Sequence, residues 1–356
     1  MTAAPRRSYD SLTRRGQIGR LRRLGRAALA AYGLDGARMT PLRHEHNTTF
    51  RVDARGGPYV LRINRPGVHT PETVGSEMAW LRAIRDETDL SVPEPVAARD
   101  GSLVVAARDA GVPDPRVCVL LRRLDGRFID ERLTPAHLRQ VARLQAGLHE
   151  HAGGWTPPQG FVRPRLDMLT SAEKAGGVGL ETARRRADHP SREDADRSLQ
   201  LIAELTSPAG AAVCAEALDV VWATTRELSA EPDGTGLIHG DLHQENYLFE
   251  RGIARAIDFD DCGWGFTLYD LAVTLSELEG RPRYDGLRAA LLDEYAGRRS
   301  LPPRADVHLE AFAILRRMQL LMWGLESRRH AAFRDGWRAW AREDLRGLAA
   351  ALDTRR

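Results

Sequence analysis

The loop His239-Gly240-Asp241-Leu242-His243-Gln244-Glu245-Asn246 and the residues after it constrain this chain more than any other part of its sequence. A short apolar run precedes the loop, so we expect a strand to lead into it. Residues 247–259 then have the pattern of a β-hairpin, with a turn at the middle. Because a hairpin brings its two open ends together, we expect Asn246 and Asp258 to lie side by side, next to the loop that carries Asp241.

The residue types at these positions point to one chemistry. Transfer of a phosphoryl group from a nucleotide needs a group that orients the attacking hydroxyl and oxygen ligands that hold magnesium. The spacing Asp-x4-Asn and the Asp-Phe-Asp that follows match the catalytic loop and the metal-binding strand end of kinases. We therefore predict Asp241 as the catalytic residue and Asn246 and Asp258 as metal ligands. The simpler interpretation, aspartates that cap turns, suits a lone Asp better than this set.

These residues resemble a known family over about forty positions, residues 237–275. His-Gly-Asp-x-His-x-x-Asn, then Ile-Asp-Phe-Asp, then Tyr269-Asp270-Leu271-Ala272 is similar to the motifs of the aminoglycoside phosphotransferase-like kinases, which include choline and homoserine kinases. The resemblance implies an α+β, two-lobed protein-kinase-like fold. It has a small β-rich N-lobe and a larger, mainly helical C-lobe, with ATP between them. Asp270 is expected to hold the backbone of the catalytic loop.

The whole chain sets the frame for this expectation. With 356 residues, 42% hydrophobic and 28% charged, it reads as an ordinary globular protein of one or two domains. We expect a basic tail and leading helix over residues 1–33, the N-lobe over 34–123 and the C-lobe over 124–356. No apolar run is long enough for a membrane span. Three widely spaced cysteines favour the cytoplasm.

The first 26 residues are strongly basic, with eight arginines against Asp10, although the whole chain carries a net charge of only +3. Such a segment is either a nucleic-acid-binding arm or a tail that leads into a solvated helix. Apolar residues at helical spacing (Ile18, Leu21, Leu24 and Ala28) favour the helix, as does the lack of interleaved aromatic residues other than Tyr9. We therefore expect neither a nucleic acid nor a membrane as partner.

The expected N-lobe contains a second hairpin, residues 50–63, and a helix over Pro71 to Asp86. In the resembled family a strand lysine binds the nucleotide phosphates and a helix glutamate holds it. Here the matching positions are Arg62 and Glu77, and Lys174 is the only lysine of the chain. Arginine keeps the charge and can grip phosphate oxygens with two N–H groups. The alternative is a solvent-facing arginine that simply pairs with Glu77.

The loop before that hairpin lacks glycine, unlike the loops of protein kinases. Asn47, Thr48 and Thr49 offer backbone N–H groups and hydroxyls instead, so we predict that they contribute to the nucleotide site together with Arg62 and Glu77. The run 117–121 is expected to be the strand that joins the lobes.

The expected C-lobe is helical from Pro135, again over residues 211–228, and from Leu268 onward. Gly176-Gly177-Val178-Gly179 follows no strand, so we expect a loop rather than a dinucleotide fingerprint. The highly charged residues 184–197 are expected to form a solvated connection.

The sequence thus predicts an ATP- and Mg²⁺-dependent phosphotransferase that acts on a hydroxyl of a small molecule: an amino alcohol, an amino acid or an aminoglycoside-like antibiotic. Two alternatives remain, a Ser/Thr protein kinase of the same family and a catalytically inactive nucleotide-binding module. Only eleven residues separate Asp258 from Asp270, which leaves no room for the long activation segment of a protein kinase. The candidates for the acceptor pocket are His243, Asp260, Asp261, Trp264, Glu277 and Trp323.

Overall fold

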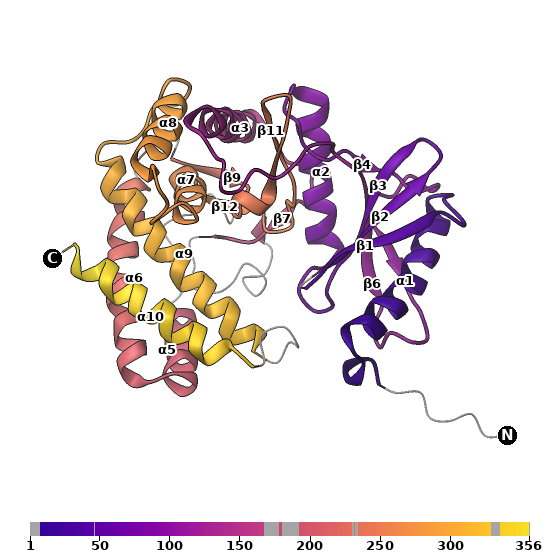
Figure 1. Cartoon of the computed structure of the whole chain (residues 1–356), viewed down its shortest axis with the longest axis horizontal. Helices are drawn as coiled ribbons and strands as arrows, with labels where there is room; N and C mark the ends of the chain where they lie inside the picture. The colour runs from indigo at the N-terminus through magenta and orange to yellow at the C-terminus, as the bar shows by residue number, and fades with distance from the viewer. Residues whose placement is uncertain are drawn as a thin grey trace. The chain divides into compact units, whose positions relative to one another are not determined.

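The computed structural model describes residues 8–45, 47–166, 178–179, 192–229, 231, 234–328 and 335–355 (Figure 1). The chain divides into two compact units, which are described separately. The first comprises residues 1–86 and 92–124, and the second comprises residues 87–91 and 125–356. The division at residues 33 and 123 expected from the sequence stays a prediction. Within the described residues, no helix is long and apolar enough to cross a membrane.

The first unit is built on an antiparallel sheet. Its strands are β1 (Arg38–His44), β2 (Thr48–Ala54), β3 (Gly57–Ile63), β4 (Pro95–Val96), β5 (Val105–Ala107) and β6 (Arg116–Arg122). The order is β1-β2-β3-β6-β4, with β5 also paired to β6. The predicted hairpin is confirmed as β2 and β3, joined through Gly56 and Gly57 at φ of 95° and 127°, which favours glycine. The strand expected over 117–121 is the central part of β6.

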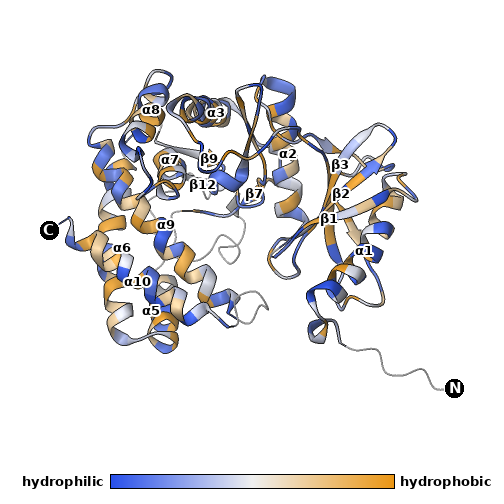
Figure 2. Cartoon of the chain, viewed as in Figure 1, coloured by the Kyte–Doolittle hydropathy of each residue, from blue (hydrophilic) through white to orange (hydrophobic). Residues whose placement is uncertain are grey.

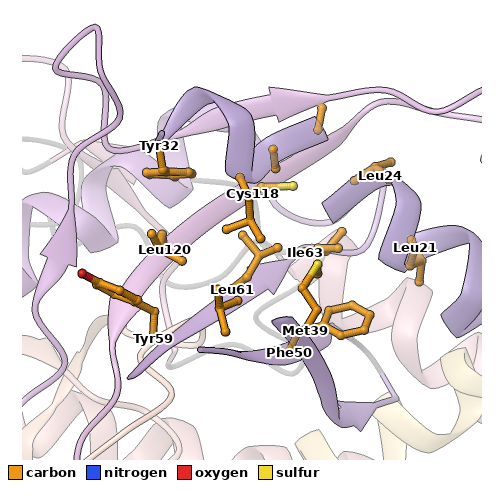
Figure 3. Close-up of a cluster of buried hydrophobic side chains, with 14 of the residues drawn as sticks. Leu21, Leu24, Tyr32, Met39, Phe50, Tyr59, Leu61, Ile63, Cys118 and Leu120 are labelled. Atoms are coloured by element: carbon orange, nitrogen blue, oxygen red, sulfur yellow. The ribbon is translucent and has the colours of Figure 1, made fainter. Parts of the chain in front are cut away.

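Two helices accompany this sheet. A short 3₁₀ turn (η1, Tyr9–Ser11) precedes α1 (Arg14–Ala31), and Thr13 caps α1 by accepting a hydrogen bond from the N–H of Gly16 at 3.3 Å. Leu21, Leu24 and Ala28 are buried, as their spacing predicted. Figure 3 shows the leucines in one cluster with apolar side chains of the strands.

Close approach between α1 and the sheet explains a glycine inside the helix. A Cβ at Gly25 would lie 2.6 Å from the terminal methyl of Met39. The second helix, α2 (Pro71–Glu87), confirms the predicted segment, and Val74, Met78, Leu81 and Ile84 form its buried stripe.

The second unit is mainly helical. Its helices are α3 (Pro135–Gly154), α5 (Arg192–Leu205), α6 (Pro208–Leu228), α7 (Thr267–Ser276), α8 (Tyr284–Ala296), α9 (Ala305–Ser327) and α10 (Trp337–Asp353). In Figure 2, α9 and α10 carry hydrophobic and hydrophilic residues on different sides, as expected of helices packed on one face. The mixed α+β fold, with a sheet in the first unit and helices in the second, confirms the predicted fold class.

Short strands frame the loop identified in the sequence. Three pairs occur in the described residues: β9 (Thr235–Ile238) with β12 (Gly263–Phe266), β10 (Tyr247–Glu250) with β11 (Ile253–Ala256), and β7 (Val162–Arg163) with β8 (Val178–Gly179). The predicted hairpin is therefore confirmed as β10 and β11, although the second strand ends at Ala256 rather than at Phe259.

Two expectations for the second unit were wrong. Residues 178–179, expected in a loop, form β8 because they pair with β7, a partner that local sequence does not reveal. Residues 192–197, expected in a solvated connection, begin α5, where Ala195, Ser198 and Ile202 are buried at helical spacing. The other residues of those two expectations, Gly176, Gly177 and 184–191, lie outside the described residues.

Candidate active site

The loop that carries Asp241 leaves β9 through a glycine that no other residue could replace without strain. Gly240 has a φ of 83°. A Cβ there would lie 2.6 Å from Cδ1 of Leu166 and 2.8 Å from the carbonyl oxygen of Asp261. The glycine of the His-Gly-Asp sequence therefore permits a tight turn in which the loop backbone packs closely against Leu166 and Asp261.

Asp270, near the start of α7, binds the backbone of this loop. Its carboxylate accepts hydrogen bonds from the backbone N–H of His239 at 2.9 Å and of Gly240 at 2.7 Å, and its side chain is fully buried. The contact expected from the sequence is confirmed. Because a buried carboxylate needs several partners, these two N–H groups both satisfy it and fix the loop.

A third partner of Asp270 was not foreseen. His149 of α3 lies with Nε2 3.0 Å from Oδ2 of Asp270, while its Nδ1 lies 2.9 Å from the hydroxyl of Tyr295 in α8. The neighbouring Gln145 donates to the carbonyl oxygen of Asp270 at 2.9 Å. Helix α3 thus contacts Asp270 directly, and α8 supports that contact through His149.

His239 joins the loop to the segment that follows the hairpin. Its Nε2 donates to the carbonyl oxygen of Ile257 at 3.1 Å, and its Nδ1 accepts from the backbone N–H of Asp241 at 3.3 Å. Burial lowers the pKa of His239, although nearby carboxylates oppose this effect. A neutral ring with one donor and one acceptor nitrogen fits these two contacts.

Asp241 and Asn246, which lie five residues apart on the loop, are in direct contact. The amide nitrogen of Asn246 donates to Oδ2 of Asp241 at 2.8 Å and to its backbone carbonyl at 2.9 Å. This orientation commits the Nδ2 end of the amide to the loop. The amide oxygen, the end that can bind a cation, is directed to the other side.

The carboxylate of Asp241 faces two further positively charged or protonatable groups. Nη2 of Arg316, on α9, lies 2.5 Å from Oδ1, and Nε2 of His243 lies 3.4 Å from Oδ2. Burial alone would raise the pKa of Asp241, but Arg316 and His243 outweigh it and hold the pKa well below the usual range. In return, Asp241 raises the pKa of His243 against the effect of its burial.

Asp258 follows the hairpin at a strained position. Its neighbour Ile257 donates its N–H to the carbonyl oxygen of Asn246 at 2.9 Å, so the two ends of the hairpin meet as predicted. Asp258 itself has a φ of 63°, which is uncommon for a residue other than glycine. Such strain often accompanies a functional role.

Arg163 fixes the turn after Asp258. Its guanidinium donates to the carbonyl oxygens of Cys262 and Asp260, both at 2.5 Å, and its side chain is almost fully buried. A guanidinium can bind two carbonyl groups at once because its N–H groups form a planar fork. The segment that carries Asp258 is therefore held at both ends.

In the first unit, Arg62 and Glu77 form a buried bidentate ion pair. Nη1 of Arg62 donates to Oε1 of Glu77 at 2.8 Å, and Nη2 donates to Oε2. The side chains are only 3% and 1% exposed. The predicted pairing is confirmed, and the alternative of a solvent-facing arginine is wrong. Binding of phosphate by this pair stays a prediction.

The three polar residues expected near the phosphates lie at the start of β2. Asn47 accepts a hydrogen bond from the backbone N–H of Arg65 at 3.1 Å, and the buried hydroxyl of Thr48 lies 2.7 Å from Nδ1 of His44. Thr49 faces Arg62 across the strand pair. His46, in the same loop, lies outside the described residues.

The acceptor-pocket candidates are dispersed. His243 contacts Asp241, and the backbone carbonyl of Glu277 accepts from Gln244 at 3.2 Å. The ring of Trp264 packs against Phe161, and that of Trp323 packs against Trp340. Of these candidates, His243 contacts the predicted catalytic carboxylate directly.

Sequence reasoning missed three residues that shape the site: Arg316, His149 and Arg163. Each contacts the catalytic loop, its support in α7 or the turn after Asp258 from a distant part of the chain, so no local motif indicates it. The sequence contains one weak indication of the role of Arg316. This residue lies between Leu315 and Met318, beside the apolar stripe of α9. An arginine next to a core-facing stripe is a candidate for a buried ion pair.

Comparison with known proteins gives the same picture. A model described as the phosphotransferase enzyme family matches residues 38–308. An uncharacterized protein of Deinococcus radiodurans is 30% identical over 85% of this chain and 80% of its own. Amicoumacin kinase of Bacillus subtilis is 23% identical over 75% and 71% of the two chains. Homoserine kinase of Rhodospirillum rubrum is 27% identical over 76% and 73%.

Solved structures share the fold. The microcompartment-associated aminopropanol kinase has a TM-score of 0.71 and 30% identity, over 92% of this chain and 95% of its own. Amicoumacin kinase hAmiN in complex with AMP-PNP, Ca²⁺ and Ami has a TM-score of 0.68 and 16% identity, over 95% and 96% of the two chains.

Proposed function

We propose that this chain, which belongs to the phosphotransferase enzyme family, uses ATP and Mg²⁺ to phosphorylate a hydroxyl group of a small molecule. The family resemblance drawn from the sequence is confirmed. The chain is therefore a kinase with an alcohol group as acceptor, and the nucleotide, the metal and the acceptor class are the parts that we infer.

The proposal rests mainly on one observation: hydrogen bonds connect Asp241, Asn246 and the segment Ile257-Asp258. Asn246 binds Asp241 through its side chain and Ile257 through its backbone, so the hydrogen bonds join Asp241 and Asn246 to the residue next to Asp258. Asp241 accepts a hydrogen bond from the acceptor hydroxyl and orients it for attack. Its low pKa keeps it ionised, as that task requires.

Asn246 and Asp258 would hold Mg²⁺. The side-chain orientation of Asn246 fits this role, since its Nδ2 is committed to Asp241 and its oxygen is left for a cation. Magnesium is usually bound by one or two protein oxygen groups together with phosphate oxygens and water, so one amide and one carboxylate suffice. When bound, the ion neutralises charge on the nucleotide phosphates.

Arg62, oriented by Glu77, supplies the positive charge toward the nucleotide phosphates in the place of the usual lysine, and Asn47, Thr48 and Thr49 contribute backbone N–H groups. The buried hydroxyl of Thr48 already faces His44, so its backbone rather than its side chain serves this role. We place the enzyme in the cytoplasm, which suits its three buried free cysteines.

The acceptor is an amino alcohol, an amino acid or an aminoglycoside-like antibiotic. The relatives named amicoumacin kinase, homoserine kinase and aminopropanol kinase support this range. The protein-kinase alternative lacks support, because α7 begins at Thr267, nine residues after Asp258. An inactive module would not need Asp241, Asn246 and Asp258 together.

The test is a panel of acceptors with purified protein, ATP and Mg²⁺, in which ADP release is followed and phosphorylated products are identified by mass spectrometry. The panel contains simple amino alcohols, homoserine, an aminoglycoside and a basic model protein, with the Asp241→Asn variant as control. We expect one small-molecule class to give Mg²⁺-dependent phosphorylation that the variant lacks. Phosphorylation of the protein alone, or no ATP turnover under any condition, would rule out the proposal.

A further inference from the structure

We propose that Arg316 is a positioning residue for Asp241, which fixes the direction of its carboxylate toward the acceptor hydroxyl. The inference deepens the proposed function and rests on it. No motif of the sequence marks Arg316, and 75 positions separate it from Asp241 in the chain.

Arg316 is confined beside the catalytic loop. The side chain of Arg316 is only 11% exposed, and its Nε is buried without a hydrogen-bond partner among the described residues. One turn further along α9, Gln319 donates to the carbonyl oxygen of Leu166 at 3.0 Å and accepts from the hydroxyl of Tyr269. The helix is thereby anchored beside the loop, where the guanidinium of Arg316 binds Oδ1 of Asp241 and also interacts with the hydroxyl of Tyr269.

The two carboxylate oxygens of Asp241 have different partners. Arg316 binds Oδ1, whereas Asn246 and His243 face Oδ2. The terminal torsion of an aspartate is broad, so one partner alone would allow the carboxylate to rotate. Partners on both oxygens fix its plane. This plane determines where the acceptor hydroxyl must lie for in-line attack.

The charged groups around Asp241 also favour this role for Arg316. The groups that act on Asp241 are Arg316 from α9 and His243 and His239 from its own loop, while Tyr269 and Glu277 act on Arg316 from the side of α7. Burial opposes the charge on both Asp241 and Arg316, and the attraction between the two groups offsets this effect. Loss of Arg316 would leave the Asp241 carboxylate, whose side chain is 19% exposed, without its principal counter-charge.

The experiment compares Arg316→Gln and Arg316→Lys with a control on the same helix. Arg317, the next residue, pairs with Glu279 at 2.8 Å at a partly exposed site and makes no contact with Asp241 among the described residues. Arg317→Gln therefore reproduces the loss of one α9 arginine without touching the carboxylate. The measurements are kcat, KM for ATP and KM for the acceptor, with the urea-unfolding midpoint of each variant as the check on folding.

For Arg316→Gln we expect kcat to fall by about 10- to 100-fold with KM for ATP within about twofold of the parent. Arg316→Lys should recover part of the rate, because it restores the charge but not the planar fork, and Arg317→Gln should match the parent.

A parent-like kcat in Arg316→Gln would overturn the inference. If that variant does not fold, Arg316→Lys decides, because parent-like behaviour there would exclude a requirement for the guanidinium geometry. If the parent phosphorylates no acceptor, the proposed function fails and this inference fails with it, whereas an active parent with a parent-like Arg316→Gln overturns the positioning role alone.

Discussion

Replacement of Arg62 tests whether the buried ion pair of the first unit serves the nucleotide or only the fold. Arg62 and Glu77 are 3% and 1% exposed and share two hydrogen bonds. Arg62→Ala leaves the Glu77 carboxylate buried and unpaired, which costs roughly 3–5 kcal/mol of unfolding free energy. That is a large part of the roughly 5–15 kcal/mol that stabilises a typical protein.

The same substitution should also weaken the binding of ATP. A hydrogen bond to a charged group contributes about 1.5–3 kcal/mol, so loss of one phosphate contact should weaken ATP binding by roughly 10- to 150-fold. Arg62→Lys should recover only part of this affinity, because an ammonium group cannot reproduce the planar fork. Affinity is measured by calorimetric titration with ATP and Mg²⁺, and stability by urea unfolding.

A double variant separates the two effects. Arg62→Met combined with Glu77→Leu removes both charges and leaves apolar side chains, so most of the stability should return. The ATP affinity should remain low. As a control, Arg51 pairs with Asp53 at 2.8 Å on the adjacent strand but is 46% exposed, so Arg51→Ala should cost at most about 1 kcal/mol. If the double variant binds ATP as tightly as the parent, Arg62 serves the fold alone.

Three further predictions concern the second unit. Asp241→Asn should abolish phosphoryl transfer while nucleotide affinity stays within a few-fold. It should also lower the pKa of His243 by NMR titration; in the parent, the stabilisation from this pair is present at low pH and is lost as the pH rises through the raised pKa of His243. Asp258→Ala should lose Mg²⁺-dependent ATP binding in calorimetry, and unchanged affinity would mean that the metal binds elsewhere. Gly324→Ala should destabilise the protein by about 1–3 kcal/mol in urea unfolding, since its Cβ would lie 1.8 Å from Cζ3 of Trp340; a parent-like midpoint would contradict this packing.

The parts of the site that the sequence predicted are those set by local geometry. Asp241 and Asn246 are five residues apart in one loop, and a two-stranded hairpin must bring Ile257 back to Asn246. The pair of Arg62 and Glu77 was also predictable, although it joins a strand to a helix. Its two positions could be matched to a family pattern, and their contact requires only that α2 packs on β3.

The residues that were missed depend on how distant elements pack. His149 reaches Asp270 from 121 positions away, and Arg163 reaches Cys262 from 99. Neither contact follows from a spacing, because each requires the relative placement of elements from separate parts of the second unit. The same reason explains β8, whose two residues are extended only because β7 pairs with them.

Lysine is scarce in this chain, and arginine makes buried cationic contacts in both units. Arg62, Arg163 and Arg316 are almost fully buried, and each binds an oxygen group of a segment proposed to act in catalysis. An ammonium group can shift its pKa and lose its charge on burial, whereas a guanidinium remains charged and offers a planar set of N–H groups. Arg163 uses that set to hold two backbone carbonyls at once, and Arg62 uses it to hold both oxygens of Glu77. A lysine at either position would lose the second contact, so these arginines should tolerate replacement by lysine much less well than exposed arginines do.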